Sequence, residues 1–315
     1  MRKFGEIGGR ATGRWFEDTG HRYFDRLVAS SIRTRKFRAI VGYESSSERA
    51  FDTAKKLGVT TILDAASLHY QTQLRFQSDP APSEALRRKE AEIRLADAVL
   101  VPSTLARESY ERAGVPAGKL HVVPLGVSLE EFRPTTADAN ARPFCFAFAG
   151  NVTRTKGVDL LLQGFAAVQG TRGVQLKIFG TGELQQSVVG PDIVWMGRVA
   201  HHVVARELPL ADCLVLPSRF DSYGFAVVEA LACGVPVIVS DMVGAKDLVV
   251  HGRNGWIFPS GDAHALASMM RTCLDTAGQR ERWRDAARSS ALTASWQLYH
   301  SRLADTVAHI LDQQR

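Results

Sequence analysis

The sequence has few of the features that mark membrane, secreted or disulfide-bonded proteins. No window reaches the roughly 18 consecutive apolar residues that a membrane-spanning helix requires. The N-terminal stretch MRKFGEIGGRATGRWF carries basic residues without an apolar segment behind them, which argues against a secretory signal. The four cysteines lie far apart in apolar segments, with neither a CxxC pair nor a dense framework. These absences predict a cytoplasmic protein whose thiols are reduced and buried.

Several catalytic and metal-binding motifs are also missing. The sequence has no Asp-x-Asp pair, no G-x-S-x-G element and no G-x-x-x-x-G-K-[ST] loop. Its histidines, including His201 and His202, do not show the spacing of a metal site. Lipase-type and ATPase-type functions are therefore not indicated. We expect neither a metal ion nor another cofactor.

Positive charge is concentrated at one end of the chain. The formal net charge is +6, and residues 1–38 hold ten basic side chains against four acidic ones, which accounts for the whole excess. Such a segment can bind an anionic membrane surface, face nucleic acid or simply be solvated. No zinc-finger spacing or RNA-binding aromatic pattern is present, so we do not expect nucleic acid as a partner. The sequence leaves a membrane surface and a solvated face as the alternatives.

What the chain does contain is an alternation of short apolar runs with helical patterns, which indicates βαβ units and parallel sheets. A first series predicts strands at 38–43, 60–63, 98–102 and 121–124, and helices at 47–57, 83–96 and 103–113. The polar segment 127–143, with its two prolines, is typical of a linker. A second series predicts strands at 144–149, 174–179, 193–196, 212–217, 236–239 and 255–258, and helices at 157–168, 201–208, 224–233, 244–250, 262–276, 279–290 and 296–312.

The two series predict two domains, which suits a chain of 315 residues. We expect an α/β protein with two Rossmann-like, doubly wound parallel-sheet domains facing a cleft. The first domain covers residues 1–138 and the second covers 139–315, with the terminal helix packing back. Ligands of such sheets bind outside the carboxyl ends of the strands.

Glycine turns after three predicted strands of the second domain suit a phosphorylated nucleotide. Gly150 opens a turn that places Lys156 at a helix start, where backbone amides and the helix dipole favour phosphate. A surface lysine beside a helix cap is the alternative. Gly180 marks a second turn, which is a weak signal alone. In the third turn, the backbone of Arg198 and Val199 can hydrogen-bond the edge of a nucleobase.

Residues 217–262 carry the strongest signal. Asp221 follows a predicted strand, and Glu229 lies in an otherwise apolar helix, where an unpaired carboxylate would be costly. Glu229 therefore needs partners, which ribose hydroxyls would supply. Eight residues of loop and helix span on the order of 10–12 Å, the length between a ribose and a transferred sugar, with the diphosphate between them near Lys156. For Asp221 and Ser222, the alternative is that both only cap the helix.

One histidine stands out in the first domain. His69 follows the predicted strand TILD and so lies at the edge of the sheet that would face the cleft. A lone histidine is more often structural than catalytic, and the sequence alone does not separate the two roles.

These motifs resemble those of a known enzyme family. The run PSRFDSYGFAVVEALACGVPVIVSDMVGAKDLVVHGRNGWIFPSGD, preceded by FAGNVTRTKGVDLLL and KIFGTGEL, resembles retaining glycosyltransferases of family 4 (glycosyl transferases group 1), which have the GT-B fold. The resemblance extends over residues 38–315 and is most specific over 97–262. It implies a nucleotide-diphospho-sugar donor in the second domain and an acceptor in the first. It also implies metal-independent transfer with retention at the anomeric carbon.

The resemblance assigns roles to individual residues. The acidic pair of the family falls on Asp221 and Glu229, its phosphate-binding lysine on Lys156, and its cleft histidine on His69, and these four are the candidate catalytic residues. In the family the second acid holds the ribose, and the first holds the donor sugar together with neighbouring amides. The candidate donor-binding residues are Gly150, Asn151, Arg154, Gly180, Arg198, Val199, Tyr223, Gly224, Phe225 and Ala226.

Three departures from the family pattern concern the site and the first domain. Asp221 replaces the usual glutamate, which shortens the reach by one methylene. Asn151 stands where a second diphosphate-binding arginine is common, although Arg154 is close enough in sequence to substitute. The opening strand and glycine-rich loop of the family are not recognisable, so we expect either a reduced first domain or a truncated start.

The resemblance implies a hexosyl-type transferase that moves a sugar from a nucleotide-diphospho-sugar to a saccharide or lipid-linked acceptor, in the synthesis of a surface polysaccharide or glycolipid. Residues 1–38 would place it peripherally on the inner face of the membrane. The alternative of another class is a non-catalytic nucleotide-sugar-binding or assembly protein with a degenerate form of the fold. An epimerase or phosphorylase on the same fold is a further alternative, although the extra acids or histidines that an epimerase needs in the cleft are not seen.

Overall fold

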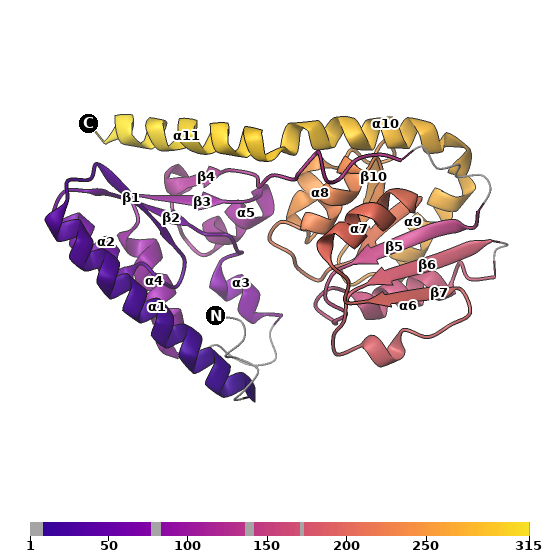
Figure 1. The fold of residues 1–315 in the computed structure, drawn as a ribbon, viewed down its shortest axis with the longest axis horizontal. Coiled ribbons are helices and arrows are strands. Elements are labelled where there is room, and N and C mark those ends of the chain that lie inside the picture. The colour runs from indigo at the N-terminus through magenta and orange to yellow at the C-terminus, as the bar shows by residue number, and fades with distance from the viewer. Residues whose placement is uncertain (1–8, 77–82, 136–141, 171–172, 315) are drawn as a thin grey trace. The chain divides into compact units, whose positions relative to one another are not determined.

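The computed structural model describes residues 9–76, 83–135, 142–170 and 173–314. The chain divides into two compact units, called unit 1 and unit 2 below (Figure 1). Unit 1 comprises Met1–Pro102, Ala106–Val123 and Arg302–Arg315, and unit 2 comprises Ser103–Leu105 and Pro124–Ser301. The predicted boundary after residue 138 lies within unit 2, and the last residues of the terminal helix are grouped with unit 1.

The sheet of unit 1 is parallel and has four strands in the order β1-β2-β3-β4. Of the two central strands, one is the continuous apolar run AVLV and the other is TTILD, and all but the last residue of TTILD are buried, as parallel strands covered by helices require. At the edge strand β1, Val41 and Tyr43 are exposed. The strands are β1 (Ala39–Tyr43), β2 (Thr60–Asp64), β3 (Ala98–Val101) and β4 (Leu120–Val122). The helices along this part of the chain are α1 (Gly9–Thr34), α2 (Glu48–Lys56), α3 (Tyr70–Leu74), α4 (Ser83–Leu95), α5 (Thr104–Arg112) and η1 (Ala117–Lys119).

The helix α1 was not predicted from the sequence. Its basic composition and internal glycines hide the helical pattern, because glycine lowers helix propensity. Over residues 19–34 of α1, the buried face is narrow and consists of Asp25, Ala29 and Ile32, which are spaced as one face of a helix. This face packs against α2. Tertiary packing, rather than local propensity, therefore accounts for the helix.

Unit 2 holds a parallel sheet of six strands in the order β10-β9-β8-β5-β6-β7. The order reverses direction after β5, so the sheet is doubly wound about β5 and β8, which pair directly. The strands are β5 (Phe144–Ala149), β6 (Val174–Phe179), β7 (Ile193–Gly197), β8 (Cys213–Leu216), β9 (Val237–Ser240) and β10 (Gly255–Phe258). Between and after them lie α6 (Val158–Ala166), η2 (Gln185–Ser187), α7 (His201–Glu207), η3 (Leu208–Leu210), α8 (Phe225–Ala232), η4 (Gly244–Leu248), α9 (Ala263–Asp275), η5 (Ala277–Gln279), α10 (Arg280–Ala291), η6 (Leu292–Ala294) and α11 (Trp296–Gln313).

The predicted α/β class and both series of strands are confirmed. One predicted helix, at 244–250, is instead the five-residue 3₁₀ segment η4. The backbone explains the change: the amides of Gly244 and Ala245 donate to the carbonyls of Asp221 and Tyr223, which ties this segment to the loop before α8. Among the described residues, no helix is both long and apolar enough to cross a membrane.

Candidate functional site

The turn between β5 and α6 positions Lys156 in unit 2. Gly157 ends this turn in the left-handed region, with φ of 72°, and a Cβ there would collide with the carbonyl of Pro217. The close approach brings the turn against the loop that follows β8. As a result, Nζ of Lys156 lies 2.6 Å from Oδ2 of Asp221. Two residues that are 65 positions apart in sequence thus form one ion pair at the carboxyl ends of two adjacent strands.

The glycine turns after β5, β6 and β7 are joined by backbone hydrogen bonds. The amide of Gly150 donates to the carbonyl of Phe179 at 3.0 Å, and the amide of Gly180 donates to the carbonyl of Gly197 at 2.8 Å. A Cβ at Gly180 would collide with the carbonyl of Gly150. The sequence marked each turn separately, and the Gly180 turn only as a weak signal. The structure brings them together as one platform beside Lys156.

Asp221 and the start of α8 form the second part of the site. The amide of Asp221 donates to the carbonyl of Met242 at 2.8 Å, and its Oδ1 accepts a long hydrogen bond of 3.4 Å from the amide of Tyr223. The helix cap is Gly224, with φ of 90°, so the alternative in which Ser222 is the cap is wrong. Phe225 is exposed and Ala226 is half-buried at the first turn of α8. No side chain of the described residues accepts a hydrogen bond from the amides of residues 224–226.

A supporting ion pair lies behind Lys156. The guanidinium of Arg219 binds Asp159 through two hydrogen bonds, of 2.7 and 2.8 Å, and the amide of Arg219 donates to the carbonyl of Thr155. This arrangement fixes the Lys156 turn against the β8 loop. The side chain of Arg154 is exposed, with Nη1 3.6 Å from Asp159, and Asn151 is exposed as well. Both remain accessible to a ligand at this edge of the sheet.

Glu229 lies one turn into α8 and has a protein partner that the sequence analysis missed. Nε2 of His201 lies 3.0 Å from Oε1 of Glu229, and Nδ1 of the same ring lies 3.3 Å from Oε1 of Glu131. The imidazole also packs edge-on against Phe132. His201 was considered only as a metal ligand. The signal that could have identified it is its place as the first residue of the helix that follows the predicted base-binding turn.

The pKa values of Glu229 and His201 depend on each other. Burial raises the pKa of the Glu229 carboxyl, and the hydrogen bond from His201 opposes that shift. The hydrogen bond to Glu229 in turn raises the pKa of His201, against a smaller opposing effect of burial. Only 13% of the Glu229 side chain is exposed, compared with 60% of the His201 side chain. The site therefore favours a proton on the imidazole and a charge on the carboxylate.

The predicted base-binding turn directly precedes His201. Arg198 is exposed, and Val199 is half-buried and packs against the core of unit 2. Because His201 reaches Glu229, the turn and the predicted ribose-binding acid lie beside each other. This is the relative placement that a nucleoside requires.

His69 belongs to unit 1 and is described there alone. Its side chain is buried and caps α3, where Nδ1 accepts from the amide of Gln71 at 3.3 Å. The ring lies against the rings of Tyr70 and Tyr110, with centroids 4.4 and 5.0 Å away. Burial lowers the pKa of His69. Its predicted contact with the donor sugar stays a prediction, and the structure adds a capping role that the sequence did not indicate.

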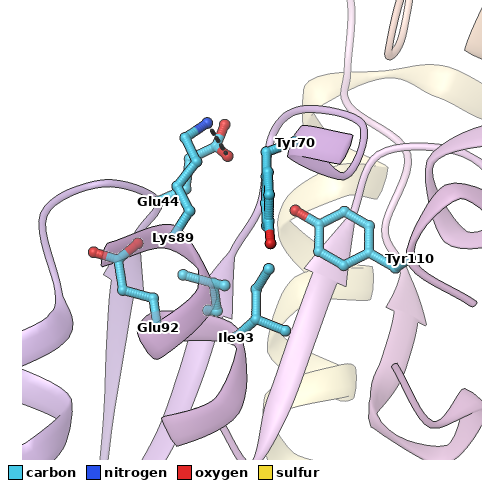
Figure 2. A pocket seen from close by; sticks show the side chains of 7 residues that line it. Glu44, Tyr70, Lys89, Glu92, Ile93 and Tyr110 are labelled. Atoms are coloured by element: carbon cyan, nitrogen blue, oxygen red, sulfur yellow. Dashed lines mark hydrogen bonds and ion pairs between the residues drawn. The ribbon is translucent and has the colours of Figure 1, made fainter. Parts of the chain in front are cut away.

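A small cavity adjoins these aromatic residues in unit 1 (Figure 2). Its volume is about 10 Å³, enough for one water molecule. Nζ of Lys89 lies 3.3 Å from Oε2 of Glu44 at its wall, and Figure 2 shows the hydroxyl of Tyr110 pointing towards Tyr70. The cavity is lined by Glu44, Leu63, Tyr70, Lys89, Glu92, Ile93 and Tyr110. It is too small for a sugar.

Within the described residues, no cluster of three or more His, Cys, Asp or Glu side chains could hold a metal ion. The acids of the unit 2 site have cationic partners instead, Lys156 for Asp221 and His201 for Glu229. The expectation that no metal or cofactor takes part stays a prediction.

Comparison with known proteins identifies the same part of the chain. The family model "Glycosyl transferases group 1" matches residues 143–276. The chain is 32% identical over 216 residues to a GDP-mannose-dependent alpha-mannosyltransferase of Mycobacterium tuberculosis, covering 64% of this chain and 54% of that protein. It is 29% identical over 205 residues to a D-inositol 3-phosphate glycosyltransferase of Jonesia denitrificans, covering 56% and 48%. The chain spans about half the length of the curated relatives it matches.

Solved structures share the fold over most of the chain. HepE of Anabaena in complex with UDP superposes with a TM-score of 0.73 at 17% identity, covering 90% of this chain and 82% of that one. The apo form of the lipopolysaccharide outer core galactosyltransferase WaaB gives a TM-score of 0.73 at 20% identity, covering 94% and 81%. At these identities, the likeness concerns the fold.

Proposed function

We propose that this chain transfers a hexosyl-type sugar, with retention, from a nucleotide-diphospho-sugar to an acceptor hydroxyl. The proposal starts from its family and fold: the chain belongs to the group 1 glycosyl transferases through residues 143–276 and has the GT-B fold. The observation that carries the proposal is the 2.6 Å pair between Lys156 and Asp221 beside the first turn of α8. A cation, a carboxylate and a set of backbone amides thereby meet at the carboxyl edge of one sheet.

Each of these groups suits one part of the donor. The amides at the start of α8 and the ammonium of Lys156 attract the diphosphate, since a helix N-terminus favours an anion. Asp221 accepts hydrogen bonds from sugar hydroxyls, while Glu229 accepts them from the ribose. The backbone of Arg198 and Val199 binds the base. Asp221 neutralises Lys156 in the ligand-free chain, so the diphosphate would share this cation with the carboxylate.

The reaction breaks the bond between the anomeric carbon and a β-phosphate oxygen and forms a bond from the same carbon to the acceptor oxygen. The acceptor proton passes to the departing diphosphate, so no separate general base is required. Lys156 and the amides of α8 stabilise the charge that develops on the leaving group, which is the electrostatic role of an oxyanion hole. Attack from the face that the diphosphate leaves gives retention.

The relatives suggest which donors to test first, without fixing the donor or the acceptor of this chain. One relative is named as GDP-mannose-dependent, and one solved structure contains UDP, so donors with either base are the first to test. A saccharide or lipid-linked acceptor bound by unit 1, within surface polysaccharide or glycolipid synthesis, completes the proposal.

The location of the enzyme is also part of the proposal: cytoplasmic, and peripheral on an anionic membrane surface. On α1, Tyr23, Phe24 and Leu27 are exposed apolar side chains, and the exposed Arg22 and Arg26 lie between and beside them. A helix with apolar and basic residues on its exposed side suits such a surface. Residues 1–8 of the basic segment lie outside the described residues.

The direct test is to incubate the purified chain with a panel of UDP-, GDP- and ADP-sugars and to measure release of the nucleoside diphosphate. We expect slow hydrolysis of one donor and faster release with a suitable acceptor. Glu229→Ala should abolish donor binding or turnover, since it removes the predicted ribose contact. Glu207→Ala is the matched control, because Glu207 is a partly buried glutamate of the same unit that pairs with Lys177.

The outcomes separate the two functions. Donor binding without release in the presence of acceptors would favour the non-catalytic alternative. Full activity of Glu229→Ala would remove that residue from the site. No binding of any donor in the panel would contradict the proposal as a whole.

A further inference from the structure

The arrangement around His201 favours a positive charge on its ring. Both ring nitrogens face carboxylate oxygens, at 3.0 Å from Glu229 and 3.3 Å from Glu131. An ionised carboxylate only accepts hydrogen bonds, and a neutral imidazole has a single N–H to donate. A neutral ring would therefore leave one nitrogen lone pair facing a carboxylate. With both carboxyl groups ionised, only the imidazolium presents an N–H to each of them, as a hydrogen bond to Glu229 and an ion pair with Glu131.

We infer that His201 is a positioning residue for the donor: its imidazolium holds the Glu229 carboxylate in place for the ribose and ties it to Glu131 in the segment between β4 and β5. The inference rests on the proposed role of Glu229 in binding the ribose. It goes beyond that role by making donor affinity, rather than the chemical step, depend on His201 and Glu131.

The local surroundings explain why Glu229 needs this support. The carboxylate lies on α8, whose other side chains are apolar, and it is mostly buried. Desolvation favours the protonated form of a carboxyl, which would donate to a ribose hydroxyl instead of accepting from it. The cation at 3.0 Å holds the carboxylate ionised and limits its rotation.

The segment that contains Glu131 is itself held in place. Phe132 is buried in the core of unit 2 and contacts the His201 ring, and its carbonyl accepts from Arg288 at 3.0 Å. The position of Glu131 is therefore set by packing against unit 2. A change at Glu131 would act on Glu229 through His201 and, more weakly, through the direct repulsion between the two carboxylates.

The charged groups that act on the imidazole come from two elements besides its own. They are Glu229 on α8 and Glu131 in the segment after β4. On α7 itself lie His202 and Arg206, and Arg198 precedes the helix. The dipole at the start of α7 opposes a positive charge at its first residue, so the two carboxylates have to outweigh it.

The test is calorimetric binding of UDP and GDP to the full chain at about pH 6 and about pH 8, where an imidazole changes charge. In His201→Gln we expect about tenfold weaker binding near pH 6, because a charge-assisted hydrogen bond is lost. The difference from the unmodified chain should shrink near pH 8. His201→Arg, which keeps a cation at every pH, should bind well at both. His202→Gln, the exposed neighbour on the same helix, is the control and should behave as the unmodified chain.

The His201 bridge is the set of contacts from the imidazole to Glu229 and Glu131. Glu131→Gln tests its contact with Glu131, and Glu130→Gln is the matched control. Donor KM should rise in Glu131→Gln by about threefold, while kcat changes little, since a positioning residue acts on binding. NMR titration of the imidazole signals provides a measurement without nucleotide. The titration midpoint of His201 should lie above that of an ordinary imidazole and fall in Glu131→Gln.

Equal nucleotide affinity of His201→Gln and the unmodified chain near pH 6 would overturn the inference, and so would an unchanged His201 midpoint in Glu131→Gln. Failure of the proposed function has a different signature. In that case the unmodified chain binds no nucleotide although the NMR titration shows the His201 bridge, which rejects the ribose-binding role of Glu229 itself.

Discussion

Unit 1 and unit 2 each place a helix after the carboxyl end of a parallel strand, α2 after β1 and α8 after β8, but the amides at the two helix starts have different partners. In unit 1, buried carboxylates fill the start of α2. Asp25 accepts from the amides of Arg49 and Ala50 at 2.8 and 2.9 Å. Glu92 accepts from the amides of Ser45 and Ser47 at 2.7 and 2.8 Å.

Among the described residues, no carboxylate accepts from the amides at the start of α8 in unit 2 in this way. Glycine occupies its cap position, and Asp221, the nearest acid along the chain, is paired with Lys156. The positive end of α2 is thus neutralised by the fold itself, whereas no side chain of the described residues caps that of α8. The contrast supports the assignment of the diphosphate to unit 2, and the following predictions test it from the largest expected effect to the smallest.

The largest effect is expected for the cation of the unit 2 site. Lys156→Ala should lower turnover by about 10²–10³-fold, because it removes a charge that stabilises the leaving diphosphate. Lys177→Ala is the control, since Lys177 is also a partly buried lysine paired with a carboxylate, Glu207 at 3.2 Å. The measurement is the rate of nucleoside diphosphate release. Similar losses in both variants would mean that the effect is not specific to the site.

Glu92, one of the two carboxylates at the start of α2, should make the stability of the protein depend on pH. Burial raises the pKa of Glu92 to about 7, and its side chain is fully buried. The folded state therefore binds a proton that the unfolded state releases near its ordinary pKa, so stability falls as pH rises from the unfolded value to about 7. The expected loss is about 3 kcal/mol over that range. Thermal unfolding of the chain and of Glu92→Gln at several pH values measures it.

The slope of stability against pH decides this second test. The absolute stability does not, because Glu92→Gln also loses one of the two hydrogen bonds from the amides of Ser45 and Ser47. Asp25, whose pKa is also raised by burial, contributes with the same sign. Glu92→Gln should flatten the pH dependence of the melting temperature, and Glu90→Gln on the same helix should not. A slope that is unchanged in Glu92→Gln would show that Glu92 titrates alike in both states.

The second carboxylate of unit 1 should affect stability without affecting the donor. Asp25→Ala leaves the amides of Arg49 and Ala50 without their acceptor and removes a cap, at a cost of about 2 kcal/mol. Asp52→Ala on α2 is the control, because its pair with Lys56 is exposed and should contribute little. Denaturant unfolding gives both values. Weaker nucleotide binding by Asp25→Ala, measured while it is folded, would contradict the separation of roles between the units.

The smallest expected effect concerns the glycine that caps α8. Gly224 and Gly58 both have left-handed φ, but only at Gly224 would a Cβ meet a neighbour, Cγ1 of Val243 at 2.6 Å. Gly224→Ala should therefore be less stable than Gly58→Ala by about 1 kcal/mol. It should also weaken nucleotide binding, which Gly58→Ala should leave unchanged. Equal stability of the two variants would mean that Val243 moves aside without cost.

The sequence predicted the sheets well because most of the buried parallel strands are continuous runs of apolar residues. FCFAFA and CLVL lie within the predicted ranges and form β5 and β8 in the structure. It predicted α1 poorly, because over residues 19–34 of this helix only the narrow face of Asp25, Ala29 and Ile32 is buried. Local pattern is informative where burial is extensive and becomes weak where a helix packs along a single row of residues.

The candidate site shows the same division. Lys156 and Asp221 were singled out from their places at strand ends, and the structure joins them. The partner of Glu229 was not found, since His201 is 28 residues away along the chain and no local pattern connects the two. The burial of Glu92 was equally hidden, because its acceptor role depends on a turn 45 residues earlier. Contacts between segments that are distant in the sequence become visible only once the fold is known.

The interlocked turns after β5, β6 and β7 restrict how donor preference can change during evolution. Position 180 admits no residue with a Cβ while the carbonyl of residue 150 stays where it is, and position 182 is closed in the same way by Val152. In the turn before α7, the exposed positions 198 and 200 are the ones where side chains can vary. Libraries aimed at altered base selectivity are best built at these two positions, with the glycine turns, Val199 and His201 held constant.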